Sequence, residues 1–135
     1  MIADYNTMLR MFRECNKMYF NKSLPTPKFV LMNKPNTLAR FEFNRNKKGK
    51  HSIKWQKIIF SDCYDFPEDV FRNLMVHELL HYFIAWNGIR DKKDHRKEFM
   101  KIDNELNETV KYDSTSFPRT EKAPQHKGLM KFLFG

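Results

Sequence analysis

The segment His77-Glu78-Leu79-Leu80-His81 is the part of this chain from which its fold can best be inferred. It is an H-E-x-x-H motif inside a stretch, residues 67–87, whose composition predicts a helix. Residues four positions apart in a helix lie on one face, one turn apart. The two imidazoles can therefore bind one metal ion together, and the glutamate between them projects close to that ion, where it can polarise a coordinated water.

The ends of this helix are also visible in the sequence. Pro67 suits the first helical turn, and Gly88 suits the residue at which a helix stops. Glu68 and Asp69 are favourable at the positive N-terminal end of the helix. Apolar residues leave no broad polar face, which is typical of a buried helix; they are Leu74, Met75, Val76, Leu79, Leu80, Phe83, Ile84 and Trp86.

A buried helix makes the polar residues of the motif informative. Burying His77, Glu78 and His81 costs free energy unless each has a partner, and one divalent cation would serve all three. The alternative is that both histidines are ordinary core residues bonded to backbone carbonyls, with Glu78 paired to a basic side chain. The complete motif in a helical context favours the metal.

Two histidines do not complete a catalytic zinc site, which normally has three protein ligands and a water. The longer pattern H-E-x-x-H-x-x-G-x-x-H is absent, because Ile84 and Asn87 stand at its Gly and His positions. We expect His95 to be the third ligand, because it heads the inward stripe of a second helix predicted at about residues 95–110. Glu98 is the competing ligand, and His95 as a solvated residue in a charged turn is the alternative.

The remaining elements follow from hydrophobic periodicity. Residues 2–20 have apolar positions at helical spacing. Residues 29–32 and 38–43 predict strands, and residues 53–61 predict one or two more. Residues 44–52 form a basic turn between them. This order of elements predicts an α+β domain with a short mixed or antiparallel sheet of about three strands, followed by the helix of the motif and one further helix.

The sequence resembles the SprT-like domain, the protease module also found in Spartan-type DNA repair proteases. The opening helix ends in Asn16-Lys17-Met18-Tyr19-Phe20-Asn21-Lys22-Ser23-Leu24-Pro25, which is similar to the family pattern N-x-x-[YF]-F-x-x-x-L-P. A β segment, Ile58-Ile59-Phe60-Ser61, leads into the H-E-x-x-H helix, and the remote pair Asp94-His95 is similar to the element that carries the family's third zinc ligand. The resemblance covers roughly residues 1–110.

This resemblance implies a zincin-like fold and a metallopeptidase activity. It implies Zn²⁺ held by His77, His81 and His95, with Glu78 as the general base in peptide-bond hydrolysis. The chain departs from many SprT proteins because its two cysteines, Cys15 and Cys63, are far apart in the sequence. It therefore has no C-x-x-C motif. The C-terminal zinc ribbon is thus lacking, which weakens any inference about substrate targeting.

Two parts of the expected mechanism remain open in the sequence. An oxyanion donor is expected, and the sequence does not select among the candidates, which are Tyr64, Tyr82, Tyr112 and His51. An extended substrate can add to a sheet edge by main-chain hydrogen bonds. Either the strand at residues 38–43 or the strand at residues 53–61 can provide that edge.

The charge of the chain suggests a second class of partner. Lys and Arg number 25 against 16 Asp and Glu, which gives a net charge of +9. Basic residues gather in two places, and such clusters attract phosphate backbones or simply form solvated faces; they are Lys47, Lys48 and Lys50, and then Arg90, Lys92, Lys93, Arg96, Lys97 and Lys101. The alternative function is therefore a non-catalytic, basic nucleic-acid-binding domain in which the metal site is structural or degenerate.

The length fits one catalytic domain, which we expect at residues 1–112. Residues 113–135 form a tail, either docked on the domain or partly disordered. The sequence has no apolar stretch long enough for a membrane span and its first residues lack the regions of a signal peptide, so we expect a cytoplasmic protein with a protein or peptide substrate and no membrane association. The oligomeric state is left open.

Overall fold

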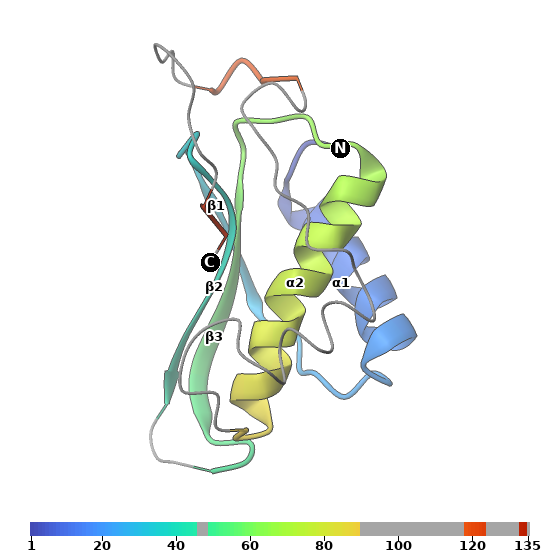
Figure 1. Cartoon of the computed structure of the whole chain (residues 1–135), viewed down its shortest axis with the longest axis vertical. Helices are drawn as coiled ribbons and strands as arrows, with labels where there is room; N and C mark the ends of the chain where they lie inside the picture. The colour runs from blue at the N-terminus through green and yellow to red at the C-terminus, as the bar shows by residue number, and fades with distance from the viewer. Residues whose placement is uncertain (46–48, 90–117, 124–132, 135) are drawn as a thin grey trace.

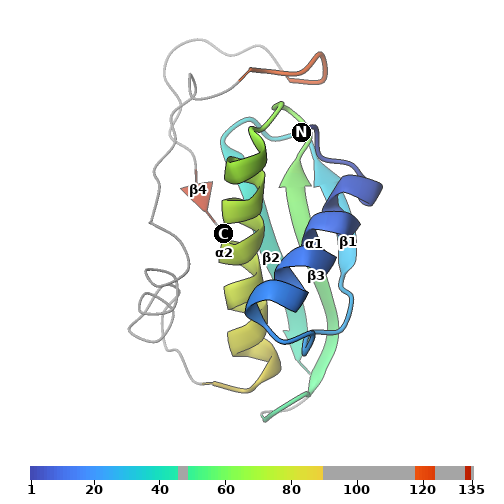
Figure 2. The ribbon, with the colours of Figure 1, turned by 90° about the vertical axis from the view of Figure 1, so that its right-hand side faces the viewer.

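The computed structural model describes residues 1–45, 49–89, 118–123 and 133–134. Two helices cover one face of a four-stranded sheet, as the two views in Figures 1 and 2 show. In chain order the elements are α1 (Tyr5–Tyr19), β1 (Lys28–Met32), β2 (Thr37–Arg45), β3 (Ile53–Ser61), α2 (Glu68–Trp86) and β4 (Leu133–Phe134). The predicted α+β class is confirmed, and the second helix expected at residues 95–110 lies outside the described residues.

The strands are arranged in the order β1-β3-β2-β4. β1 runs parallel to β3, β2 runs antiparallel to β3, and β4 runs parallel to β2. The sheet is therefore mixed, one of the two arrangements expected, and it has one strand more than the three expected. Residues 53–61 form one continuous strand in the middle of the sheet. That strand is paired on both sides and cannot be the edge that accepts a substrate, whereas the outer side of β2 is paired with β4 only at Thr37 and Ala39.

Helix α1 begins at a side-chain cap. The Asp4 carboxylate accepts a hydrogen bond of 2.7 Å from the backbone N–H of Thr7, which satisfies one free donor of the first turn. The same bond holds the pKa of Asp4 below its usual value, because the N–H favours the ionised carboxylate. Of the apolar positions that predicted α1, Met8, Phe12 and Cys15 are buried together with Met11, whereas Tyr5 is exposed.

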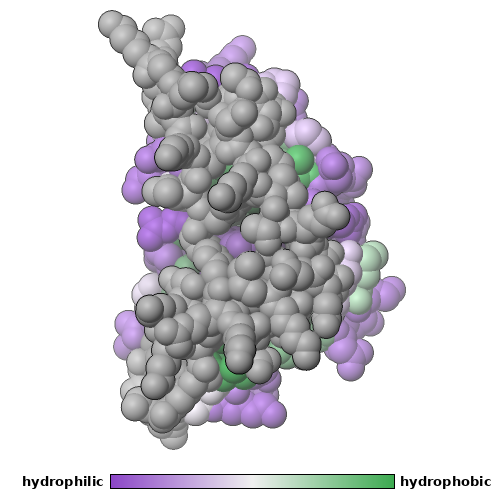
Figure 3. Space-filling model, viewed as in Figure 1, coloured by the Kyte–Doolittle hydropathy of each residue, from purple (hydrophilic) through white to green (hydrophobic). Residues whose placement is uncertain are grey.

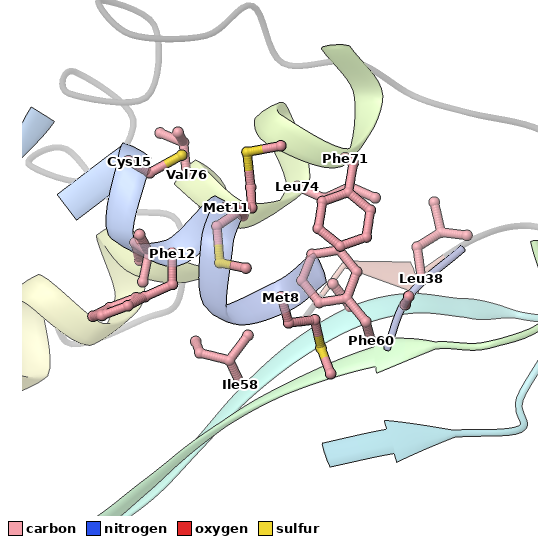
Figure 4. Close-up of a cluster of buried hydrophobic side chains, with 14 of the residues drawn as sticks. Met8, Met11, Phe12, Cys15, Leu38, Ile58, Phe60, Phe71, Leu74 and Val76 are labelled. Atoms are coloured by element: carbon pink, nitrogen blue, oxygen red, sulfur yellow. The ribbon is translucent and has the colours of Figure 1, made fainter. Parts of the chain in front are cut away.

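The core lies between the helices and the sheet (Figure 4). The rings of Phe60 on β3 and Phe71 on α2 are stacked with their centroids 4.5 Å apart. Met8 of α1, Leu38 of β2 and Ile58 of β3 point into the same space, and each is at most 1% exposed. Residues from three strands and two helices thus form one core, which fixes α2 against the sheet.

Residues 118–123 lie against the loop between β3 and α2. The N–H of Asp65 donates to the Pro118 carbonyl at 2.9 Å, and the N–H of Thr120 donates to the Cys63 carbonyl at 2.8 Å. Neither α1 nor α2 combines the length and the hydrophobicity needed to cross a lipid bilayer, and no other helix occurs among the described residues. The division of the chain at residues 112 and 113 stays a prediction.

Candidate metal centre

Helix α2 carries the H-E-x-x-H motif near its middle. His77 and His81 are partly exposed, whereas Glu78 is 1% exposed. The two imidazole rings have their centroids 5.2 Å apart and lie at 80° to each other. One donor atom from each histidine and one carboxylate oxygen of Glu78 all lie within 4.8 Å of one another. The sequence predicted that these three side chains lie close together, and the structure confirms this.

The donor set suits a zinc ion. Zn–N and Zn–O bonds are about 2.0–2.2 Å long, so one ion joins donor atoms that are about 3–4 Å apart. The candidate donor nitrogens of His77 and His81 lie within 4.8 Å of each other, and a carboxylate oxygen of Glu78 lies within the same distance of both. Imidazole nitrogen is a favourable zinc ligand, and a cation beside the buried Glu78 carboxylate would lower the free-energy cost of its burial.

Two of the expected site residues lie outside the described part of the chain. They are His95, the predicted third ligand, and its competitor Glu98. Their role stays a prediction. Among the candidate oxyanion donors, Tyr112 lies outside the described residues as well.

The other candidate oxyanion donors are engaged elsewhere. The Tyr82 hydroxyl donates to the Pro25 carbonyl at 2.7 Å, and the Tyr64 hydroxyl donates to the Pro35 carbonyl at 2.6 Å. Both side chains are fully buried, and burial raises the pKa of each hydroxyl. The His51 ring stacks on Trp86 at the C-terminal end of α2, more than one turn beyond the motif. These three residues therefore support the fold around the motif.

The motif at residues 16–25, where α1 ends, is linked to α2 by the hydrogen bond from Tyr82 to Pro25. Asn16 there binds the backbone of Leu24 twice: its amide nitrogen donates to the Leu24 carbonyl at 2.9 Å, and its amide oxygen accepts from the Leu24 N–H at 3.2 Å. These bonds close the loop that precedes Pro25, and the Pro25 carbonyl receives the Tyr82 hydroxyl. The motif at the end of α1 thus positions a loop that contacts α2 on one side.

Strand β2 holds the same helix from the sheet side. The Phe41 ring stacks on Tyr82 with centroids 5.3 Å apart, and Phe43 stacks on Phe41 at the same centroid distance. Tyr82 directly follows His81 in α2. The middle of β2 is therefore in contact with the turn of α2 that carries the second histidine.

The C-terminal end of α2 is fixed by the β2–β3 turn. The His51 N–H donates to the Trp86 carbonyl at 2.7 Å, and the two rings stack with centroids 4.4 Å apart. Gly88 has a φ of +65°, and a Cβ at this position would lie 2.8 Å from the carbonyl carbon of Gly49. The sequence marked Gly88 as a helix end, but the close approach of Gly49 had no local signal.

Comparison with known proteins agrees with this geometry. The chain matches the SprT-like family over residues 8–123, which includes the opening-helix motif, all three long strands and the H-E-x-x-H helix. No curated protein and no solved structure matches the chain. The family match covers well over half of the sequence, and on this basis the chain belongs to the SprT-like family.

Proposed function

We propose that this protein is a zinc-dependent metallopeptidase that hydrolyses peptide bonds. The observation that carries the proposal is the convergence of donor atoms from His77, Glu78 and His81 within 4.8 Å on one buried helix. Membership of the SprT-like family supports it. The alternative, in which the histidines are structural core residues, is less favourable because both rings are partly exposed and meet beside a carboxylate.

In this proposal His77 and His81 hold the metal, and His95 completes the ligand set, with Glu98 as the competing third ligand. A bound zinc ion supplies Lewis-acid chemistry, lowering the pKa of a coordinated water toward neutrality and polarising the scissile carbonyl. Glu78 accepts a proton from the attacking water as its oxygen bonds to the carbonyl carbon. Glu78 then delivers that proton to the amine as the C–N bond breaks, so the carboxylate is regenerated.

A casein or DNA–protein conjugate cleavage assay tests this proposal. Glu78→Gln should lower the cleavage rate by at least about 10²-fold, because an amide cannot accept the proton of the attacking water. The matched control is Glu121→Gln, which makes the same chemical change at an exposed residue and should leave the rate unchanged. Equal rates for wild-type protein and Glu78→Gln would refute the role of Glu78.

A second proposal, compatible with the first, is that the protein associates with nucleic acid. Both helices lie on one face of the sheet, so the opposite face is left open by the described helices (Figures 1 and 2). On that face Lys28 of β1 is the register partner of Lys57 of β3, so two positive charges lie on neighbouring strands. Trp55 is 38% exposed, and the Lys57 ammonium lies 4.8 Å from its ring centroid.

An aromatic ring beside lysines suits a nucleobase and its phosphates. The described surface visible in Figure 3 is mostly hydrophilic, in keeping with a net charge of +9. Binding of a single-stranded oligonucleotide should weaken as salt rises, and the double change Lys28→Gln with Lys57→Gln should reduce the salt dependence. If Glu78→Gln binds as wild type does while both proteins lack peptidase activity, the non-catalytic alternative is favoured.

A further inference from the structure

The outer edge of β2 is occupied by a strand from the other end of the chain. β4 pairs with β2 in parallel orientation, with Leu133 opposite Thr37 and Phe134 opposite Ala39. The other edge of β2 is paired with β3 from Ala39 to Arg45. β4 therefore adds to the sheet by main-chain pairing, as an extended peptide does when it binds a free sheet edge.

Strand β2 contacts the helix that carries the candidate metal centre. Ala39 and Phe41 are two positions apart on β2, so their side chains lie on the same face of the sheet. Phe41 stacks on Tyr82, the residue next to His81. In Figure 2, β4 lies beyond β2 at the end of the sheet, which agrees with the strand order.

We propose that the β2 edge is a binding site for extended apolar peptides, and that residues 133–134 occupy it in cis and compete with peptides supplied in trans. The inference deepens the proposed peptidase function, because an occupant of this edge also competes with substrate. The chemical class of the ligand follows from the two residues that occupy the edge, Leu133 and Phe134, which are both apolar.

The pairing is short enough to be displaced. β4 contributes two residues, and its register shifts between Thr37 and Ala39. Beyond Ala39, β2 continues to Arg45, and no strand in the described part of the chain pairs with this edge there. A longer peptide could form more main-chain hydrogen bonds along the edge than β4 does. The cis segment competes mainly because the chain tethers it at a high effective concentration.

The test uses the full chain with substitutions that prevent β4 from pairing with β2. In the variant Leu133→Pro with Phe134→Pro, the missing N–H groups and the fixed φ angle prevent normal strand pairing. Both proteins also carry Glu78→Gln, so that peptide binding is measured without cleavage. The probe is a fluorescent synthetic peptide with the sequence of residues 128–135, Gly-Leu-Met-Lys-Phe-Leu-Phe-Gly. The control peptide has proline at its sixth and seventh positions.

We expect the proline variant to bind the probe at least about fivefold more tightly than the parent, because the competing cis segment reduces the fraction of chains with a free edge. Hydrogen exchange of the backbone amides at residues 37–39 should be faster in the proline variant and should slow again when the probe is added. The control peptide should bind neither protein. Equal probe affinity for both proteins, or unchanged exchange at residues 37–39, would overturn the inference.

Cleavage measurements separate this inference from the proposed function. With Glu78 intact, the proline variant should hydrolyse a peptide substrate several-fold faster than wild type at low substrate concentration. Tighter probe binding by the proline variant with no hydrolysis by either protein would support the edge site and refute the peptidase. Hydrolysis at equal rates without any probe binding would refute the edge site and leave the peptidase standing.

Discussion

Gly88 shows how a single residue supports the candidate site. It ends α2 with a φ of +65°, and its missing Cβ leaves room for the backbone of Gly49. Gly88→Ala should lower the free energy of unfolding by at least about 1–2 kcal/mol, because an L side chain in this backbone region is strained and the Cβ would also displace the turn. Urea denaturation measures the change. An unchanged denaturation midpoint would show that the contact with Gly49 is unimportant.

The thiol of Cys15 gives a prediction for pH dependence. Cys15 is fully buried, and burial raises the pKa of its thiol from 9.0 to about 11. In the unfolded chain the thiol loses its proton near pH 9, while in the folded chain it keeps the proton until about pH 11. The unfolded state therefore binds fewer protons in this window, and the free energy of unfolding should fall as pH rises from about 9 to 11.

Denaturation at pH 8 and pH 10.5 in wild type and in Cys15→Ala measures this effect. Cys63 is also buried and its pKa is also raised by burial, so it contributes to the fall in both proteins. The wild type should lose up to about 2 kcal/mol more than the variant over this range. An equal loss in both proteins would mean that the Cys15 thiol does not titrate differently in the folded state.

At the residue scale, the sequence predicted the grouping of the candidate metal-site residues better than the contacts of the residues around them. His77, Glu78 and His81 are found together because helical spacing alone brings them to one place. Tyr82 and Tyr64 were equally plausible oxyanion donors, since a sequence does not say where a hydroxyl points. Their partners, the carbonyls of Pro25 and Pro35, are 57 and 29 residues away and are fixed only by tertiary packing.

At the scale of elements, α2 depends on the loop that follows α1. Tyr82→Phe removes the hydroxyl that donates to Pro25 and keeps the ring that stacks on Phe41. The free energy of unfolding should fall by about 1–2 kcal/mol, because a carbonyl loses its buried partner. Thermal unfolding followed by circular dichroism measures the loss. Tyr5→Phe, at a residue that is 58% exposed, is the control and should unfold as wild type does.

The long elements were predictable and the shortest one was not. α1, α2, β1, β2 and β3 each lie within about three residues of the expected range, because apolar periodicity over five or more residues carries a clear signal. β4 has two residues and no periodicity, so the sequence could not reveal it. The strand order was also hidden, because pairing between distant segments is decided by packing in the whole domain.

At the scale of the whole molecule, elements from both ends of the described chain complete the layers that surround α2 and the sheet. α1 and its loop support α2 on one side, the sheet supports it on the other, and β4 closes the edge of the sheet next to β2 (Figure 2). The candidate metal centre is thus built on the most buried helix of the described structure, and the core fixes the backbone that carries the two histidines.

The zinc content of protein purified without added metal tests the central claim most directly. Mass spectrometry of wild type and Glu78→Gln should find about one zinc ion per chain, whereas His77→Ala and His81→Ala should retain little, because a typical catalytic zinc site has only three protein ligands. His51→Ala removes a histidine that stacks on Trp86 away from the motif, and it should keep the full zinc content. Zinc missing from the wild type, or retained fully by His77→Ala and His81→Ala, would contradict the assignment of the metal to these two histidines.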